Sequence, residues 1–215
     1  MDIRQYSTNN RIIAGLIACM NEKPFRTLTN KEIIDKAEVS PRTFYRYYKD
    51  KNELLDRLEA EILKGLAHAL ADDREALEHL QHSPNKRDII DLADPAFRET
   101  LAFAEKHKEI GRALLSENGD IKFARQVVKV SENEFRARAK YLSGDQHIKV
   151  DDEIFVNMYI SQIINVIEDW LFFSDNVSPS TIRRIIGQIQ VMSPFEMLKL
   201  MTSEQEGSTH GMQNA

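Results

Sequence analysis

The amino-acid sequence predicts an all-α protein, with an N-terminal three-helix helix-turn-helix domain joined to a C-terminal helical bundle that dimerises. Apolar residues recur about every 3.6 residues through most of the 215-residue chain, as on one face of an α-helix. Only 8 Gly and 6 Pro interrupt this pattern, and no strand-like alternation is present. We expect domains at 1–50 and 51–201, followed by a disordered polar tail at 202–215.

The segment 27–51 contains two short helices with clear start signals. Thr29 precedes the first helix and Glu32 follows three residues later, which is a capping-box pattern. Ser40 precedes the second helix, and Pro41 occupies its first position, where the missing N–H costs nothing. Two capped helices in close succession predict a helix-turn-helix, which places its second helix in the DNA major groove.

The second helix has two contrasting faces at about 100° per residue. Phe44 and Tyr48 should point inward against the first helix, onto Ile33, Ile34 and Ala37. Arg42 and Arg46 point the opposite way, where guanidinium groups can address guanine edges. Hydroxyls that can meet the two phosphate backbones flank this pair, on Thr43, Tyr45 and Tyr47. The alternative is a solvated cationic surface, although exposed tyrosines gain nothing there.

From about residue 9 to residue 57 the chain resembles the DNA-binding domain of the TetR/AcrR family of one-component bacterial regulators. In that family a first helix, here 9–22, supports the helix-turn-helix. The motif residues that match are Val39, Ser40, Thr43, Phe44, Tyr45, Tyr47, Tyr48 and Lys51. The helix faces and the resemblance together predict that double-stranded operator DNA is contacted by Thr29, Arg42, Thr43, Tyr45, Arg46, Tyr47 and Lys51.

Three positions depart from the family pattern. Glu38 stands in the turn where the family usually has glycine, which predicts a strained turn. Pro24 replaces a common glycine before Phe25. Arg42 replaces a frequent small residue and so adds a further side chain that can contact a base.

Charge and composition agree with a DNA-binding head on an acidic body. Residues 1–57 hold 11 Lys and Arg against 8 Asp and Glu, whereas the remainder holds 18 against 26. The single Cys19 allows no disulfide within one chain and favours a reducing compartment. Because residues 1–10 are polar and no long apolar run follows, we expect a cytoplasmic protein without a membrane partner.

The remaining helices are predicted in order from apolar spacing. A long helix at 52–80 starts in the head and ends in the body, so it should link the two mechanically. The Ser83-Pro84-Asn85 sequence interrupts the pattern at 82–87. Further helices are expected at 95–106, 108–116 and 121–142, with turns at 118–120 and 143–145.

The last two predicted helices, 152–173 and 181–192, suggest a subunit interface. Apolar residues surround most of the first, so it must be buried on several sides. Such helices can pair with their copies as a four-helix interface, and the resemblance also implies a homodimer here. The expected interface residues are Ile163, Ile167, Trp170, Ile182, Ile186 and Ile189. The alternative is a helix buried within one monomer.

Candidate small-molecule chemistry is limited to the body. The helices could enclose an apolar effector pocket, although core packing is the better explanation of each residue taken singly. The residues that could line it are Phe97, Leu101, Phe123, Val127, Phe135, Met158 and Trp170. His79 and His82 lie three apart without a third ligand at useful spacing, which favours a solvated surface pair over a metal site. No catalytic set or glycine-rich phosphate loop is present, so we expect neither an enzyme nor a cofactor.

Two functions remain compatible with these patterns. The first is a dimeric transcription factor, a repressor by family resemblance, that binds a palindromic operator and is released by a small apolar effector. The second is a DNA-bound scaffold or co-activator whose body binds another protein. A closed apolar cavity would favour the first, and a filled core with an exposed apolar patch would favour the second.

Overall fold

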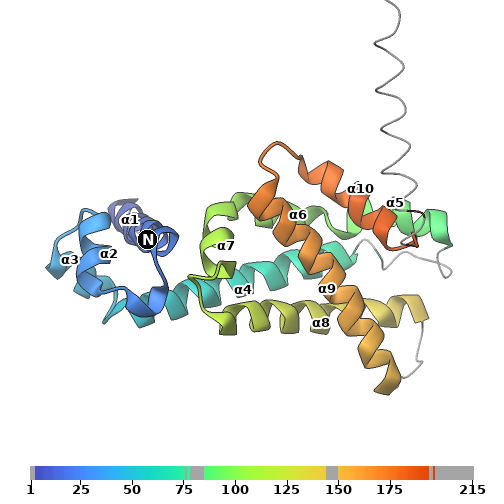
Figure 1. Ribbon diagram of the computed structural model, residues 1–215, viewed down its shortest axis with the longest axis horizontal. Helices are drawn as coiled ribbons and strands as arrows, with labels where there is room; N and C mark the ends of the chain where they lie inside the picture. The colour runs from blue at the N-terminus through green and yellow to red at the C-terminus, as the bar shows by residue number, and fades with distance from the viewer. Residues whose placement is uncertain (1–2, 76, 78–84, 144–149, 194–195, 197–215) are drawn as a thin grey trace, which may run out of the picture.

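The structure is a computed structural model in which a small helical head and a larger helical body share one long helix (Figure 1). It describes residues 3–75, 77, 85–143, 150–193 and 196. Every regular element within these ranges is helical, in agreement with the all-α prediction. None of the described helices is long and apolar enough to cross a bilayer.

The head is built from α1 (Ile3–Glu22), the 3₁₀ turn η1 (Phe25–Thr27), α2 (Asn30–Lys36) and α3 (Pro41–Tyr47). Its core is formed by fully buried side chains from each helix and from the start of the next, among them Ile12, Leu16, Met20, Ile33, Phe44 and Leu54. The predicted inward direction of Phe44 and Tyr48 is confirmed, because their exposed fractions are 0% and 6%. Helices α1 and α2 therefore fix α3 by its apolar face.

The turn between α2 and α3 contains a strained residue at the position predicted from sequence. Glu38 has a φ of +50°, in the left-handed region that favours glycine. Its backbone carbonyl accepts a hydrogen bond from the Arg11 guanidinium, and its carboxylate forms an exposed ion pair with the same group. The backbone contact does not depend on the side chain, so glycine could replace Glu38 without losing it.

We expect Glu38→Gly to stabilise the head. The left-handed conformation costs a non-glycine residue about 1–2 kcal/mol, which glycine would avoid. Glycine also makes the unfolded chain more flexible, and this offsets roughly 0.5–1 kcal/mol of the stabilisation. The unfolding midpoint, followed by circular dichroism, should rise by about 2–4 °C per kcal/mol gained. Glu38→Ala keeps the Cβ and removes the ion pair, so an equal gain with alanine would show that strain is not the cause.

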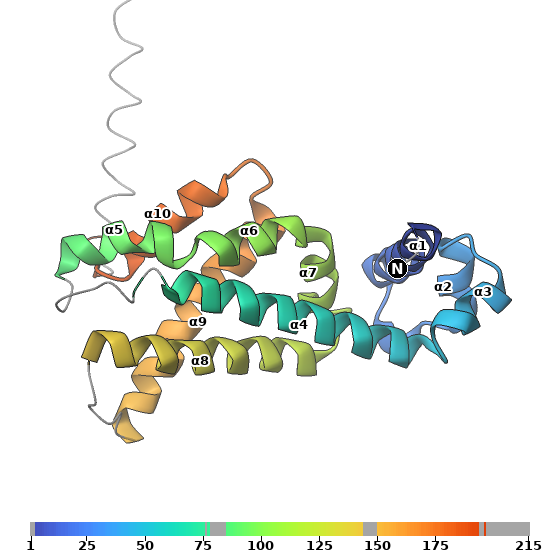
Figure 2. The ribbon, with the colours of Figure 1, turned by 180° about the vertical axis from the view of Figure 1, so that it is seen from behind.

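Helix α4 (Lys51–Glu75) passes from the head into the body, as both views show (Figures 1 and 2). Leu54, Leu55 and Leu58 belong to the core cluster that contains the head residues. Farther along, α4 packs against α6 (Arg98–Lys106) and α8 (Ile121–Ser143). The predicted mechanical link is thus present, although the last predicted residues, 78–80, lie outside the described part of the chain.

The body also contains α5 (Lys86–Ala96), α7 (Lys108–Leu115), α9 (Val150–Phe173) and α10 (Pro179–Ile189). Helix α8 runs beside α4, α9 crosses α8, and α10 lies on α5 (Figures 1 and 2). Apart from α5, these elements match the predicted helices except at their ends. The predicted tail at 202–215 lies outside the described residues.

The helix α5 was not expected from the sequence, where residues 82–87 were interpreted as a break and a helix was placed from residue 95. In the structure Asn85 begins α5, since its side chain accepts hydrogen bonds from the N–H groups of Arg87 and Asp88. Pro95 lies near the end of α5 rather than at a helix start. The Asn85–Asp88 capping box was the signal that could have revealed this helix.

The packing of α10 corrects the predicted subunit interface. Gly187 lets α10 approach α5 closely, because a Cβ there would lie 2.8 Å from the Ile90 carbonyl oxygen. This contact buries Ile182 and Ile186 inside the protomer. Ile163 and Trp170 of α9 are buried in the same cluster, and Ile167 and Ile189 pack against it. The alternative of burial within one monomer therefore holds for four of the six residues. Ile167 and Ile189 remain partly exposed, and their place in the interface stays a prediction.

Candidate nucleic-acid interface and effector pocket

The outer face of α3 presents the side chains that the sequence proposed for contacting DNA. Ser40 starts the helix by accepting a hydrogen bond from the Thr43 N–H at 3.1 Å. Arg42, Tyr45 and Arg46 are exposed, and Thr43 and Tyr47 are half-buried beside them. Since the opposite face is anchored by Phe44, the helix holds these groups outward on a rigid support.

Neighbouring side chains orient part of this surface. The Tyr45 hydroxyl lies 3.4 Å from the Asn30 amide nitrogen, and its ring packs edge-on against Phe44. The Arg46 guanidinium lies over the Tyr47 ring, 5.2 Å from its centroid. Arg42 forms no hydrogen bond or ion pair with any described residue. Its guanidinium is therefore available to a partner.

Thr29 and Lys51, both predicted to contact DNA, have hydrogen-bond partners inside the head. Of these contacts, only the Thr29 cap was predicted from the sequence. Thr29 caps α2, with Glu32 in the reciprocal contact, which confirms the predicted capping box. The Lys51 ammonium donates to the carbonyl oxygens of Phe25 at 2.9 Å, Arg26 at 3.2 Å and Leu28 at 2.6 Å. An ammonium has three donors, so all of them are used inside the head. Lys51 thus joins η1 to α4 rather than facing outward.

A second connection joins the head to the body beside α4. The turn between α7 and α8 places Asn118 against the end of α1. Its side-chain amide donates to the Met20 carbonyl oxygen at 2.8 Å, and its own carbonyl accepts from the Phe25 N–H at 2.8 Å. The head is therefore held both by the continuous α4 and by this turn. The sequence interpretation had treated 118–120 only as a turn.

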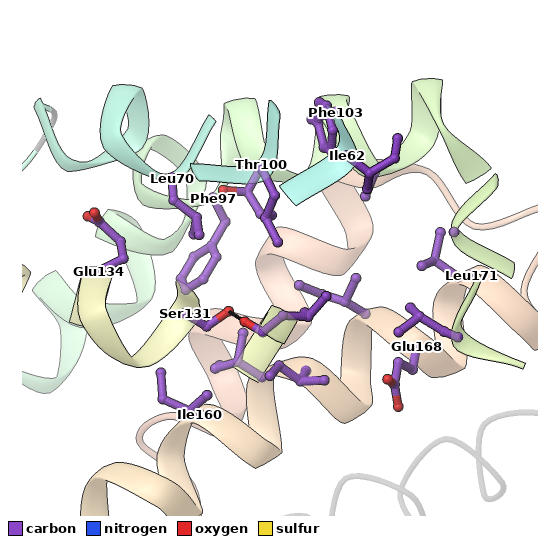
Figure 3. A pocket seen from close by; sticks show the side chains of 18 of the residues that line it. Ile62, Leu70, Phe97, Thr100, Phe103, Ser131, Glu134, Ile160, Glu168 and Leu171 are labelled. Atoms are coloured by element: carbon purple, nitrogen blue, oxygen red, sulfur yellow. Dashed lines mark hydrogen bonds between the residues drawn. The ribbon is translucent and has the colours of Figure 1, made fainter. Parts of the chain in front are cut away.

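The body contains a partly open apolar pocket of about 140 Å³ among α4, α6, α7, α8 and α9 (Figure 3). Its apolar walls include Ile62 and Leu66 from α4, Phe103 from α6, and Phe123 from α8. Engineered apolar cavities of about 150 Å³ remain dry and bind benzene, so the space suits an apolar molecule. Because α4 forms one wall, a ligand here contacts the same helix that enters the head.

Asp73 fixes the start of α6 above this pocket. Its carboxylate accepts from the N–H groups of Glu99 at 2.7 Å and Thr100 at 2.9 Å, and from the Thr100 hydroxyl at 2.6 Å. No side chain caps α6 from its own N-terminal residue, Phe97. Asp73 therefore caps α6 from a neighbouring helix and sets the position of Thr100 in the pocket wall.

Sequence comparison matches both parts of the chain to regulators. Residues 12–58 match the model for bacterial regulatory proteins of the tetR family, and residues 91–191 match a transcriptional regulator C-terminal region. Together these matches cover more than half of the chain. The chain belongs to the TetR family. Both matched models describe parts of bacterial transcriptional regulators.

Individual relatives and a solved structure agree with this membership. The chain is 26% identical over 123 residues to the uncharacterised HTH-type regulator YxbF of Bacillus subtilis, covering 56% of this chain and 30% of YxbF. It is 31% identical over 113 residues to YvkB of the same organism, covering 46% of this chain and 55% of YvkB. The chain therefore spans 30% of the length of YxbF and 55% of the length of YvkB. A TetR regulator from Streptococcus agalactiae shares the fold, with a TM-score of 0.53 at 17% identity over 88% of this chain and 96% of that chain.

The pocket of this TetR-family chain contains only some of the residues predicted from the sequence. Phe97, Phe123, Val127 and Phe135 line it. Leu101 and Trp170 are instead buried in the core, and Met158 is exposed, so these three predictions were wrong. The sequence interpretation missed the polar lining residues, whose positions on α6 to α9 depend on how these helices pack.

The predicted surface histidines lie outside the described part of the chain, since residues 78–84 are not placed. Within the described residues, no group of three or more His, Cys, Asp or Glu side chains is arranged to hold a metal ion. Cys19 is buried beside the head core, and burial raises the pKa of its thiol.

Proposed function

We propose that this TetR-family protein is a dimeric repressor that binds a palindromic operator and is released by a small molecule in the body pocket. The observation that carries the proposal is that α4 forms part of the pocket wall and continues into the head. A ligand that moves α4 would change the distance between the two heads. Each recognition helix must enter its own groove, about 34–36 Å apart, so a shift of a few ångströms prevents simultaneous docking.

The proposed DNA surface assigns different tasks to the α3 side chains. Arg42 and Arg46 address base edges, because they occupy the exposed centre of the helix face. Hydroxyls on Thr43, Tyr45 and Tyr47 contact phosphates on either side, with Thr29 at the start of α2. We leave Lys51 out of this set, because its ammonium is held by three carbonyl oxygens.

Replacing Arg46 with alanine should weaken operator binding by about 1–3 kcal/mol and relax preference at one base position. Tyr47→Phe removes only a hydroxyl and should weaken specific and random DNA alike. Fluorescence anisotropy with operator and scrambled duplexes at one fixed salt concentration separates these effects. Equal losses on both duplexes for Arg46→Ala would identify Arg46 as a phosphate contact and contradict the assignment.

For the dimer we propose the outward face of α9. Ile154, Phe155 and Met158 are between 64% and 70% exposed, and Phe173 at the other end is 82% exposed. The spacing of these residues places them on one side of the helix, with the polar residues Ser161, Asn165 and Asp169 between the two apolar ends. An exposed apolar face of this kind indicates contact with another protein surface.

Met158→Glu should convert the dimer to a monomer and reduce operator affinity, because a carboxylate would be buried without a partner. We expect the dimer dissociation constant to rise roughly 30-fold or more, the range of an interface hot spot. Asn157→Glu adds the same charge to a neighbouring exposed position directed about 100° away and serves as the control. Analytical ultracentrifugation measures both variants.

The second candidate function is a DNA-bound scaffold whose body binds another protein, and the same apolar α9 face favours it. A stable monomer of the unmodified protein at micromolar concentration would support the scaffold over the dimeric repressor. Regulation by a ligand also requires reciprocity, since operator DNA must lower ligand affinity by the factor that ligand lowers operator affinity.

A further inference from the structure

The polar side chains that line the pocket differ in whether they are already paired. The Thr100 hydroxyl donates to Asp73, the Ser131 hydroxyl donates to the Val127 carbonyl oxygen at 3.0 Å, and the Tyr159 hydroxyl lies 3.1 Å from the Gln190 side-chain oxygen. These three hydroxyls are therefore already hydrogen-bonded within the protein. A ligand that bonded to them would have to displace an existing partner.

Arg138, the lining cation, donates a hydrogen bond from each of its three nitrogens. Its Nε donates to Glu134 at 3.0 Å, Nη1 to the Ala96 carbonyl oxygen at 2.8 Å, and Nη2 to the Leu70 carbonyl oxygen at 2.9 Å. Glu134 is also paired with Arg74 at 2.9 Å. An anionic ligand that drew Arg138 away from these contacts would leave the buried carbonyl oxygens of Ala96 and Leu70 without a donor, which is costly.

Glu168 and His107 are the lining ionisable groups without a hydrogen bond or ion pair to any described residue. Figure 3 shows Glu168 beside Leu171, at the opposite end of the pocket from Glu134. Burial, followed by the nearby Asp169, raises the pKa of Glu168. Burial and Lys106 lower the pKa of His107, whose ring packs on Phe103, and this favours the neutral imidazole.

The charge balance of the lining follows from these pairings. At one end, Arg74 and Arg138 both pair with Glu134, so that carboxylate is fully compensated. The lowered pKa of His107 favours its neutral form, which adds no charge. Glu168 then leaves a carboxylate with no compensating cation at one end of an apolar space. A desolvated carboxylate of this kind gains from a positive partner and repels a negative one.

We propose that the pocket binds an apolar organic cation, a lipophilic amine whose charged nitrogen pairs with Glu168 while its apolar body lies among the aromatic side chains. The apolar body would contact Phe103 and Phe123, and the ammonium would replace the missing partner of Glu168. This inference rests on the proposed function in taking the pocket as the effector site, and it adds the chemical class of the effector.

Three probes with the same apolar body test the class: phenylbutylammonium, phenylbutanol and phenylpentanoate. Calorimetric titration of the full chain without DNA should show the ammonium binding at least about tenfold more tightly than the alcohol, as expected for one charge-assisted hydrogen bond. The carboxylate should bind most weakly. Equal or tighter binding of the alcohol or the carboxylate, or no binding by any probe, overturns the proposal.

Glu168→Gln tests the residue. This variant should lose the preference for the ammonium over the alcohol and leave the affinity for the alcohol within about twofold, since shape is kept and only charge is removed. Asp169→Asn removes the neighbouring exposed charge and should keep the preference. An unchanged preference in Glu168→Gln, or an equal loss in Asp169→Asn, would exclude Glu168 as the binding group.

Operator affinity is measured separately, by anisotropy without any probe, so the two claims fail independently. If the protein prefers the ammonium through Glu168 but does not bind palindromic DNA, the proposed ligand class is supported and the proposed repressor function is contradicted. If the protein binds the operator as a dimer but shows no preference for the ammonium, the repressor function is supported and the proposed ligand class is contradicted.

Discussion

Replacing Asp73 with alanine should lower the free energy of unfolding by about 3 kcal/mol or more, because three donors lose their acceptor and each buried donor left unpaired costs roughly 1–3 kcal/mol. Asp73 is 1% exposed, and its carboxylate satisfies three donors at the start of α6. Without it two backbone N–H groups and the Thr100 hydroxyl would be buried unpaired, and the favourable charge at the helix N-terminus would be lost.

Chemical denaturation followed by circular dichroism measures this loss, and two variants calibrate it. Asp72→Ala removes an exposed carboxylate at the adjacent position and should change stability by less than about 0.5 kcal/mol. Thr100→Val removes only the hydroxyl bond and should cost about 1 kcal/mol. If Asp73→Ala costs no more than Thr100→Val, then water or another group replaces the carboxylate and the capping role is wrong.

Replacing Glu59 with glutamine should stabilise the protein at pH 8 and have little effect in acid. Glu59 lies on α4 where the head meets the body, is 8% exposed, and has one carboxylate oxygen buried without a hydrogen-bond partner. Burial, then Asp120 and Asp56, raise its pKa to about 7, and Lys122 opposes this only partly. The protein therefore favours the protonated, neutral acid, which glutamine imitates in size and charge.

The direction of the pH effect follows from the raised pKa. The unfolded chain releases the Glu59 proton near its ordinary value of 4.5, whereas the folded protein holds it to about 7. Stability associated with this proton is present in full below pH 4.5 and is lost as the pH rises to about 7. At about 1.4 kcal/mol per unit, the advantage of Glu59→Gln should grow by about 2 kcal/mol from pH 5 to pH 8.

Urea denaturation of both proteins at the two pH values tests this result. Glu61→Gln changes an exposed carboxylate two residues away on α4 and serves as the control. An advantage of Glu59→Gln that is the same at pH 5 and pH 8 would mean that glutamine improves packing and that Glu59 is not held protonated.

The head followed from the sequence because its signals are local. The Thr29 cap, the Ser40 cap and the four-residue spacing of Phe44 and Tyr48 act within one or two helical turns, and the structure confirms each. The strain at Glu38 was likewise visible as a side chain in a turn that favours glycine. Helix α5 was not predicted, because Ser83-Pro84 interrupts the apolar pattern directly before the Asn85 cap.

The contacts of Lys51 and of the C-terminal helices could not be predicted from local sequence signals. Whether the Lys51 ammonium faces DNA or three backbone carbonyls depends on where η1 lies, which no spacing within α4 specifies. Helix α9 is apolar on nearly every side, so its sequence predicts burial but not which side a partner covers. Ile163 and Trp170 are buried by other helices of the same protomer, whereas Met158 is exposed to solvent.

The sequence by itself determined the helical class, the capped recognition helix and the family, because propensity, capping and short-range spacing are properties of neighbouring residues. Only the tertiary structure decided which polar groups became partners across distant helices. The pairing of Arg74 with Glu134, the cap that Asp73 provides to α6 and the unpaired Glu168 all arise where helices meet. Desolvation at those contacts sets the cost of leaving a charge unpaired, and it exists only after the chain has folded.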